Sequence, residues 1–218
     1  MIKISKSVMI LLFSIVLSGC ATKGVVNMPV IEPIQNKNLE NKKVYVKVYY
    51  SQPEPGIFSG GKQQKFAPIK DAKLSIASSR VLSRFDEIVK QQLPLNSSIT
   101  QSPLSDYKLL VYLKAKDKKG PAYQEYNLGT SLAKGILSLG LASDDYSIIG
   151  DFDIKYELFD NKENKVHEGM YTVYDEIEHE RGGFDSYRHG DDLAQQLLEK
   201  HIRLTMHEYF LAMPKSST

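Results

Sequence analysis

The chain is poor in cysteine and has no tryptophan: Cys20 is its one cysteine among 218 residues. A disulfide needs two cysteines, so the mature fold must be held together without one. The chain also lacks an excess of charge of one sign, with 28 basic and 26 acidic side chains. Proteins that bind nucleic acid through its phosphates carry a basic excess or a basic patch. The sequence therefore argues against nucleic acid as a partner.

Long hydrophobic runs are lacking as well. The apolar stretch at 8–17 is shorter than the roughly 20 residues that a helix needs to cross a bilayer. It follows a short head with two lysines and ends in the small residues Ser18 and Gly19. A basic head, a brief apolar stretch and small residues in this order are typical of a secretory signal. We predict that residues 1–19 are a signal peptide.

Motifs of common enzyme chemistries are also lacking. No Gly-x-Ser-x-Gly nucleophile motif occurs, and the glycines at 60–61 lack the frame of a phosphate-binding loop. Histidines and carboxylates gather at 176–192 without the spacing of a known metal site, so a solvated polar loop is the simpler interpretation. Asp151 and Asp153 lie at strand spacing and are expected to face solvent. We predict a protein that is not an enzyme and needs no metal and no cofactor.

The residues Leu17-Ser18-Gly19-Cys20 resemble the lipobox of bacterial lipoproteins. The resemblance implies that the Cys20 thiol receives diacylglycerol, that the chain is cleaved just before it, and that the new amine is often acylated, for example with palmitate. Two or three acyl chains anchor a protein stably, whereas one binds only marginally. Ala21 and not aspartate follows the cysteine, which in lipoproteins of enteric-type bacteria implies sorting to the outer membrane. We expect a protein bound to that membrane by lipid on Cys20, with its domain facing the periplasm.

The remaining chain divides into three parts. Residues 20–42 are rich in Asn, Gln, Lys and Pro and lack periodicity, which predicts a lipid anchor and flexible tether. Fully stretched, about 20 residues reach some 65–70 Å. The alternative is that this segment packs partly on the domain. Residues 43–212 have the length of one ordinary domain with its own core, and residues 213–218 are expected to be a disordered tail.

Hydrophobic periodicity predicts the elements of the domain. Apolar and polar residues alternate in four segments, which are expected to be strands at 44–50, 107–115, 146–159 and 166–177. Apolar residues recur every three or four positions at 72–93 and 191–211, which predicts two amphipathic helices. We predict an α+β fold with a single sheet of about four strands and both helices packed on one face, because this arrangement buries every apolar stripe. The order is strand, helix, strand, apolar insert, strand, strand, helix.

A lipobox, a tether and a small domain of this order resemble several families of small α/β envelope lipoproteins of Gram-negative bacteria. Auxiliary lipoproteins of ABC-type transport systems are among them. A pattern common in these families is similar to the phrase at 105–111, Ser-Asp-Tyr-Lys-Leu-Leu-Val. The likeness rests on architecture and this one phrase, so it carries over no functional residue. It implies an accessory role in an envelope assembly.

The insert between the second and third predicted strands, at 128–142, is apolar and rich in glycine. It is too short to span a bilayer as a helix, which takes about 20 residues. An exposed apolar patch usually marks an interface. The candidate interaction surface on the insert consists of Leu128, Leu132, Ile136, Leu139 and Leu141. The alternative is an element tucked over the sheet.

Two functional hypotheses follow. The first is a non-enzymatic accessory or adaptor subunit, anchored in the outer membrane, that binds an envelope protein through a sheet edge or through the insert. The second is a lipid-binding or lipid-shuttling module that uses the insert at 128–142 as a lid. An apolar cavity between sheet and helices would favour the second hypothesis, and a packed core with a flat exposed patch would favour the first.

Overall fold

The computed structural model describes residues 23–55, 61–128, 144–181 and 188–214 of the chain. The expected signal peptide at 1–19, the expected anchor at Cys20 and the end of the expected tail at 215–218 lie outside these ranges. Among the described residues, no helix combines the length and the apolar character needed to span a membrane.

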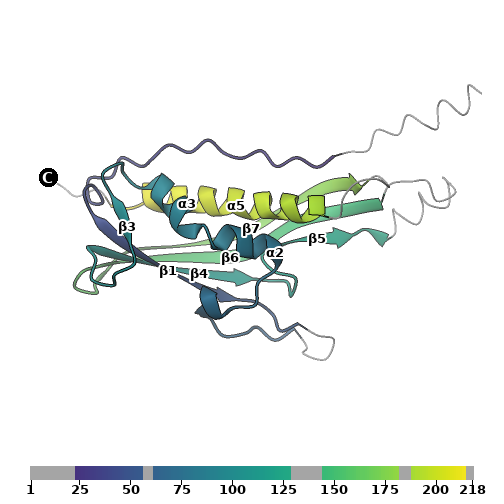
Figure 1. Cartoon of the computed structure of the whole chain (residues 1–218), viewed down its shortest axis with the longest axis horizontal. Helices are drawn as coiled ribbons and strands as arrows, with labels where there is room; N and C mark the ends of the chain where they lie inside the picture. The colour runs from purple at the N-terminus through teal and green to yellow at the C-terminus, as the bar shows by residue number, and fades with distance from the viewer. Residues whose placement is uncertain (1–22, 56–60, 129–143, 182–187, 215–218) are drawn as a thin grey trace, which may run out of the picture.

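One mixed sheet of seven strands forms the base of the domain (Figure 1). The strands are β1 (Lys43–Ser51), β2 (Ala67–Pro68), β3 (Ser98–Thr100), β4 (Tyr107–Ala115), β5 (Ala122–Tyr126), β6 (Asp144–Asp160) and β7 (Lys165–Arg181). The long strand β6 pairs antiparallel with β7 along one edge, and with β5 and then β4 along the other. β1 pairs parallel with β4, and its other edge pairs with β2 and β3.

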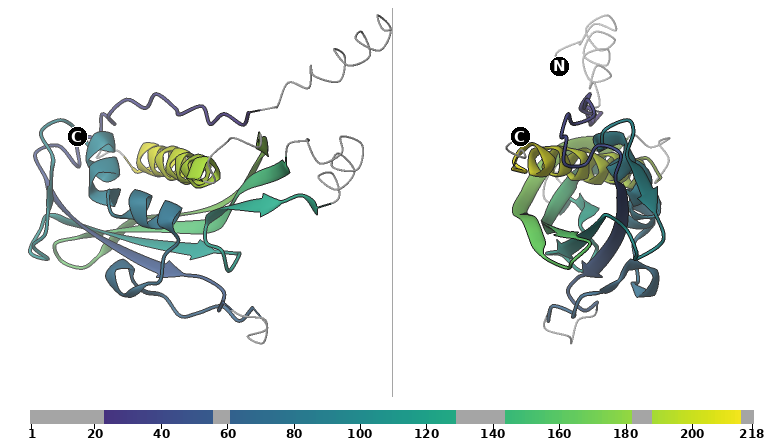
Figure 2. Two further views of the ribbon diagram at one scale, coloured as in Figure 1. Left: turned by 45° about the vertical axis from the view of Figure 1, so that its right-hand side comes forward. Right: turned by 90° about the vertical axis from the view of Figure 1, so that its left-hand side faces the viewer.

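All three α-helices of the described residues lie on one face of this sheet (Figures 1 and 2). They are α2 (Ile76–Leu82), α3 (Phe85–Gln92) and α5 (Arg188–Leu211), and a short 3-10 helix, η1 (Ile69–Asp71), precedes them. α5 packs on β5, β6 and β7, and α2 and α3 pack against α5. The predicted α+β class is confirmed. The predicted sheet of about four strands was an undercount, because the described residues form seven strands.

The missed strands are short. β2 and β3 are two and three residues long, and β5 has five residues. A period of two cannot be recognised in so few positions. These strands form because the longer strands β1 and β6 offer them edges for backbone pairing, which the local sequence does not reveal.

The helix predicted at 72–93 is two helices with a break at Ser83 and Arg84. α2 begins after Ser75, whose hydroxyl accepts a hydrogen bond from the Ser78 backbone N–H and so caps the first turn. The apolar stripe continues across the break. Its buried members are Ala77, Val81, Phe85 and Ile88. The amphipathic face was therefore predicted well, although the number of helices was too low.

Apolar side chains fill the space between the sheet and α5. The members with no exposed surface include Leu109, Val111, Leu113, Ile154, Tyr156, Leu158, Leu197, Ile202 and Met206. The Tyr156 hydroxyl shares a hydrogen bond of 2.9 Å with Thr205 Oγ1 in this layer. Burial raises the pKa of Tyr156 far above its ordinary value, so the hydroxyl stays protonated. Sheet and helices therefore share one packed core.

The N-terminal segment forms a third layer over the helices (Figures 1 and 2). From its first described residue it runs along α5, so that α5 lies between the segment and the sheet. Val26, Ile34 and Leu39 are buried in the common core. The Ile34 backbone N–H donates a hydrogen bond of 2.9 Å to the Gln92 carbonyl. The described part of the expected tether, 23–42, is thus in contact with the domain.

The beginning of the expected C-terminal tail also contacts the domain. Met213 is buried in the core, and the Pro214 carbonyl accepts a hydrogen bond of 2.8 Å from Asn38 Nδ2. These two residues are the described part of the segment at 213–218. Both ends of the described chain therefore pack on the helical side of the sheet.

Candidate functional site

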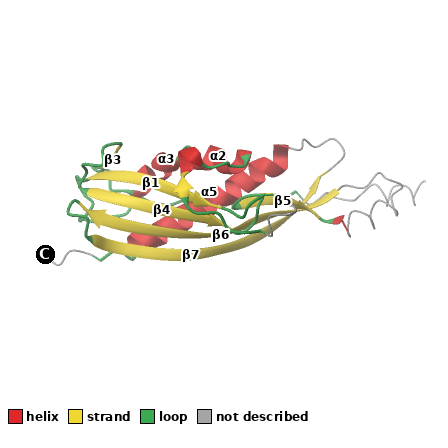
Figure 3. Cartoon of the chain, turned by 90° about the horizontal axis from the view of Figure 1, so that it is seen from below, coloured by secondary structure: helices red, strands yellow, loops and turns green. Residues whose placement is uncertain are grey.

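Figure 3 shows the sheet from the side opposite the helices. This face carries polar and aromatic side chains. Along β4, every second residue points inward and is buried, while Tyr112 and Lys114 point outward and stay partly exposed. Paired residues on neighbouring strands share a face, so the same alternation continues on β6 and β7. We call this outward surface the open face.

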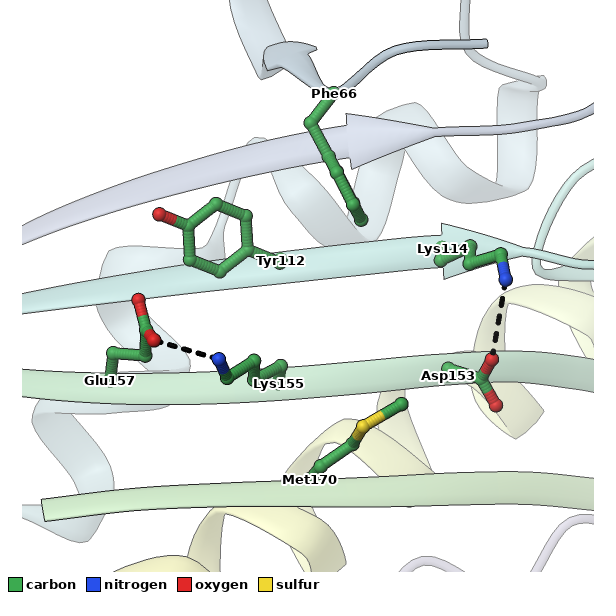
Figure 4. A pocket seen from close by; sticks show the side chains of 7 residues that line it. All are labelled: Phe66, Tyr112, Lys114, Asp153, Lys155, Glu157 and Met170. Atoms are coloured by element: carbon green, nitrogen blue, oxygen red, sulfur yellow. Dashed lines mark ion pairs between the residues drawn. The ribbon is translucent and has the colours of Figure 1, made fainter. Parts of the chain in front are cut away.

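A groove of about 420 Å³ lies on the open face (Figure 4). It is lined by Phe66, Tyr112, Lys114, Asp153, Lys155, Glu157 and Met170. The alignment of the strands positions the side chains of its floor. Tyr112, Lys155 and Met170 form one row across β4, β6 and β7. In the next row, Lys114 on β4 lies opposite Asp153 on β6. The position of these side chains is therefore fixed by the sheet.

One wall of the groove is aromatic. Tyr49 on β1 stacks on Tyr112 with ring centroids 5.1 Å apart, and Phe66 meets Tyr112 edge-on at 5.4 Å. Such pairs contribute about 0.5–1.5 kcal/mol beyond the area they bury. On the other side of the groove Met170 is 67% exposed. Apolar surface on both sides is thus open to a partner.

The floor of the groove is charged, and its charges are paired. Glu157 lies 2.8 Å from Lys155 Nζ and 2.9 Å from Lys165 Nζ. Burial acts to raise the pKa of Glu157, but the hydrogen bonds from the two lysines outweigh burial, and the pKa lies below its ordinary value. Lys114 lies 3.9 Å from Asp153. A carboxylate that stays ionised near neutral pH is suited to recognition by charge, and not to proton transfer at that pH.

Replacing Glu157 with glutamine is expected to lower the free energy of unfolding by about 1–2 kcal/mol at neutral pH, because two lysines lose their largely buried partner. The folded-state pKa of Glu157 is depressed, so its stabilisation is present above the ordinary carboxyl pKa and is lost as the pH falls through the folded-state value. The difference between wild type and Glu157→Gln should therefore shrink as the pH falls below the ordinary carboxyl pKa. Urea unfolding at neutral pH and at an acidic pH below that value measures the difference.

Glu168→Gln is the matched control for this prediction. Glu168 contacts the same two lysines, at 2.7 Å from Lys165 Nζ and 3.7 Å from Lys155 Nζ, but its side chain is exposed. Exposed ion pairs contribute little to stability, so we expect Glu168→Gln to lower the free energy of unfolding by less than Glu157→Gln does. If the effect of Glu157→Gln were the same at both pH values, packing of the amide and not the charge would be its cause.

The structure describes one of the candidate interaction residues on the insert. Leu128 follows β5 and is 61% exposed. The remaining candidates lie outside the described residues, as does the lipidation site; they are Leu132, Ile136, Leu139, Leu141 and Cys20. The groove was not predicted from the sequence. The alternation at 107–115 signals a polar face, but the contact of Phe66 depends on the pairing of β2 with β1, which the sequence does not show.

The stretch rich in histidine and acids at 176–192 is divided between two elements. His179 is buried on β7, with its ring 5.0 Å from the ring of His189 on α5. Asp192 on α5 pairs with Arg80 on α2 at 2.8 Å. In the part of the chain that the structure describes, no three His, Cys, Asp or Glu side chains are placed to hold a metal ion.

No family model and no curated protein matches the chain. Among solved structures, a DUF330 protein from Xanthomonas campestris has a TM-score of 0.37 at 12% identity, over 87% of this chain and 95% of that chain. A minor lipoprotein from Acinetobacter baumannii has a TM-score of 0.38 at 10% identity, over 83% of this chain and 99% of that chain. A neuraminyllactose-binding hemagglutinin homolog from Helicobacter pylori has a TM-score of 0.35 at 9% identity, over 85% of this chain and 89% of that chain. These TM-scores are too low to carry an argument about this chain.

Proposed function

We propose that the protein is a non-enzymatic lipoprotein of the outer membrane that faces the periplasm and serves as an accessory or adaptor subunit of an envelope assembly. The observation that supports this most is the open face, where an aromatic wall and Met170 border a floor of paired charges. Exposed apolar surface next to charged groups is typical of protein interaction sites. The proposed partner is an envelope protein that offers an apolar side chain flanked by charges of both signs.

The anchor in this proposal is lipid on Cys20, in keeping with the lipobox at 17–20. Acyl chains confine the domain to the membrane surface, which raises its effective concentration for a partner in the same membrane. The role of the protein is then positional: it holds the open face within reach of the assembly. No chemical step is needed for this role.

The packed core supports an adaptor over a lipid-binding module. A module that carries lipid needs an apolar cavity large enough for acyl chains. The space between the sheet and α5 is instead occupied by fully buried side chains such as Leu113, Ile154 and Leu197. The insert at 128–142 stays a second candidate surface in this proposal, because Leu128 at its beginning is exposed.

In-cell photocrosslinking tests the proposed surface. A photoreactive residue at position 170, in place of Met170, is expected to trap one dominant envelope protein, because it lies in the groove. The same residue in place of Ile76, which is 61% exposed and lies on the helical side, is the matched control and should not trap that protein. Phe66→Ala should reduce the yield at position 170 several-fold, since it removes part of the aromatic wall.

Three other outcomes would contradict the proposed surface. Equal trapping at positions 170 and 76 would show that the contact is not specific to the groove. An unchanged yield in Phe66→Ala would show that the aromatic wall does not contribute. Recovery of phospholipid from probes at Ile136 and Leu139, with no protein adduct from the groove, would favour the lipid-binding module instead.

A further inference from the structure

The first described residues of the chain are fixed at one end of the sheet. The Gly24 backbone N–H donates a hydrogen bond of 3.3 Å to His179 Nδ1, near the end of β7. The backbones approach so closely that a Cβ atom at Gly24 would lie 3.0 Å from Glu178 O and from Ile177 Cγ2. The chain therefore enters the domain where β6 begins and β7 ends (Figure 2).

A short stretch separates this point from the proposed lipid. A chain spans at most about 3.5 Å per residue, so the four steps from Cys20 to Gly24 cover no more than about 14 Å in any conformation. A free tether from 20 to 42 would instead reach some 65–70 Å. With Gly24 held against β7, the lipid can enter a bilayer only when this end of the domain is close to it.

The same end carries side chains suited to a lipid surface. Cross-strand pairing joins Tyr126 on β5, Tyr146 on β6 and His179 on β7 in one row. The rings of Tyr126 and Tyr146 lie 5.3 Å apart, and the Arg181 guanidinium lies 5.1 Å from the Tyr146 ring. Leu128, two residues beyond Tyr126, is exposed. Tyrosine combines an apolar body with a polar tip, which suits the boundary between membrane and water. The Arg181 side chain is 14% exposed and pairs with Asp144 at 2.6 Å, so it supports this row of rings and is not part of the surface offered to lipid.

We infer that this end of the domain rests on a phospholipid surface. We call it the membrane end; its residues are Gly24, Tyr126, Leu128 and Tyr146. The inference rests on the proposed lipidation of Cys20. It goes further, because it gives the domain a fixed orientation. The strands lead away from the bilayer, and the nine residue steps along β6 from Tyr146 to Lys155 place the groove about 30 Å above it.

Lipidated full-length protein in vesicles of phosphatidylethanolamine and phosphatidylglycerol tests this orientation. Lipid occupies the only native thiol, so one introduced cysteine can be labelled selectively with a fluorophore. Leu128→Cys and Leu104→Cys form a matched pair. Both leucines are exposed, at 61% and 91%, and Leu104 precedes β4 at the opposite end of the sheet. Nitroxide groups on the lipid heads are expected to quench the label at 128 several-fold more than the label at 104.

A second pair lies on one strand. Glu178→Cys and Val166→Cys label exposed positions near the two ends of β7, about 40 Å apart. The label at 178 should be quenched more strongly. Equal quenching at both ends in a protein that floats with the vesicles would overturn the fixed orientation and leave the proposed lipoprotein standing. A protein that does not float, or whose mass shows no acyl group, would overturn both.

Discussion

Replacing Cys20 with serine is expected to abolish acylation of the protein and to leave the leader uncleaved. The lipobox resemblance implies that the thiol accepts the diacylglycerol and that cleavage follows this step. Serine offers a hydroxyl, which is a much weaker nucleophile than a thiol at its ordinary pKa. Cells fed an alkyne-tagged palmitate should label the wild-type protein and not Cys20→Ser. The variant should accumulate as a precursor that keeps residues 1–19.

A secreted form separates lipid attachment from cleavage. With an ordinary cleavable leader in place of residues 1–19 and serine at position 20, the domain should move from the membrane pellet to the soluble extract. It then lacks the acyl chains, each of which contributes about 0.8 kcal/mol of membrane binding per buried CH₂.

The double variant Cys20→Ser, Thr22→Cys, with its own leader, is the matched control for the palmitate labelling. It keeps one thiol but breaks the lipobox spacing, so it should stay unlabelled. Palmitate found on Cys20→Ser would contradict the proposed anchor.

Segments with a long, regular period could be predicted from the sequence. The alternation at 146–159 belongs to β6 and the alternation at 166–177 to β7, and both strands extend beyond the predicted ends. A strand ends where its partner stops pairing, and periodicity alone does not contain that information. The pairing of β6 with β7 continues to Arg181, although polar residues interrupt the apolar pattern there.

The groove could not be predicted, because it depends on how strands are aligned. Tyr112 lies next to Lys155, and Lys155 next to Met170, only in the observed register of β4, β6 and β7. An irregularity between Leu158 and Phe159 shifts the pairing with β7. A slip of one residue would turn every side chain of a strand to the opposite face. The sequence could thus predict a polar face but not which residues meet on it.

The N-terminal segment is a case in which composition left two alternatives open. Residues 20–42 have the polar, proline-containing composition of a linker. The buried apolar side chains of its described part, Val26, Ile34 and Leu39, have no regular spacing, since residues 23–42 lie along α5 without forming a helix or strand of their own. Packing of such a segment is decided by the surface it meets, which the sequence of the segment does not contain.

Replacing Leu39 with alanine should show whether residues 20–42 are a free tether or a packed segment, because the two alternatives predict very different free energies of unfolding. Its side chain is fully buried, and its carbonyl accepts a hydrogen bond of 2.5 Å from Ser97 Oγ. Truncation of a buried leucine costs about 2–5 kcal/mol, so we expect Leu39→Ala to lower the free energy of unfolding by that amount. Truncation of a residue in a free tether would leave it unchanged. Urea unfolding of the secreted serine form, followed by circular dichroism, measures the difference.

Val30→Ala is the matched control for Leu39→Ala, because Val30 lies in the same segment and is 99% exposed. We expect it to change the free energy of unfolding by less than about 0.5 kcal/mol. Equal stability of the two variants would contradict the packing of residues 23–42 on the domain. The short reach from Cys20 to Gly24 would then no longer hold the membrane end at the bilayer, because a free segment lets the domain turn in any direction.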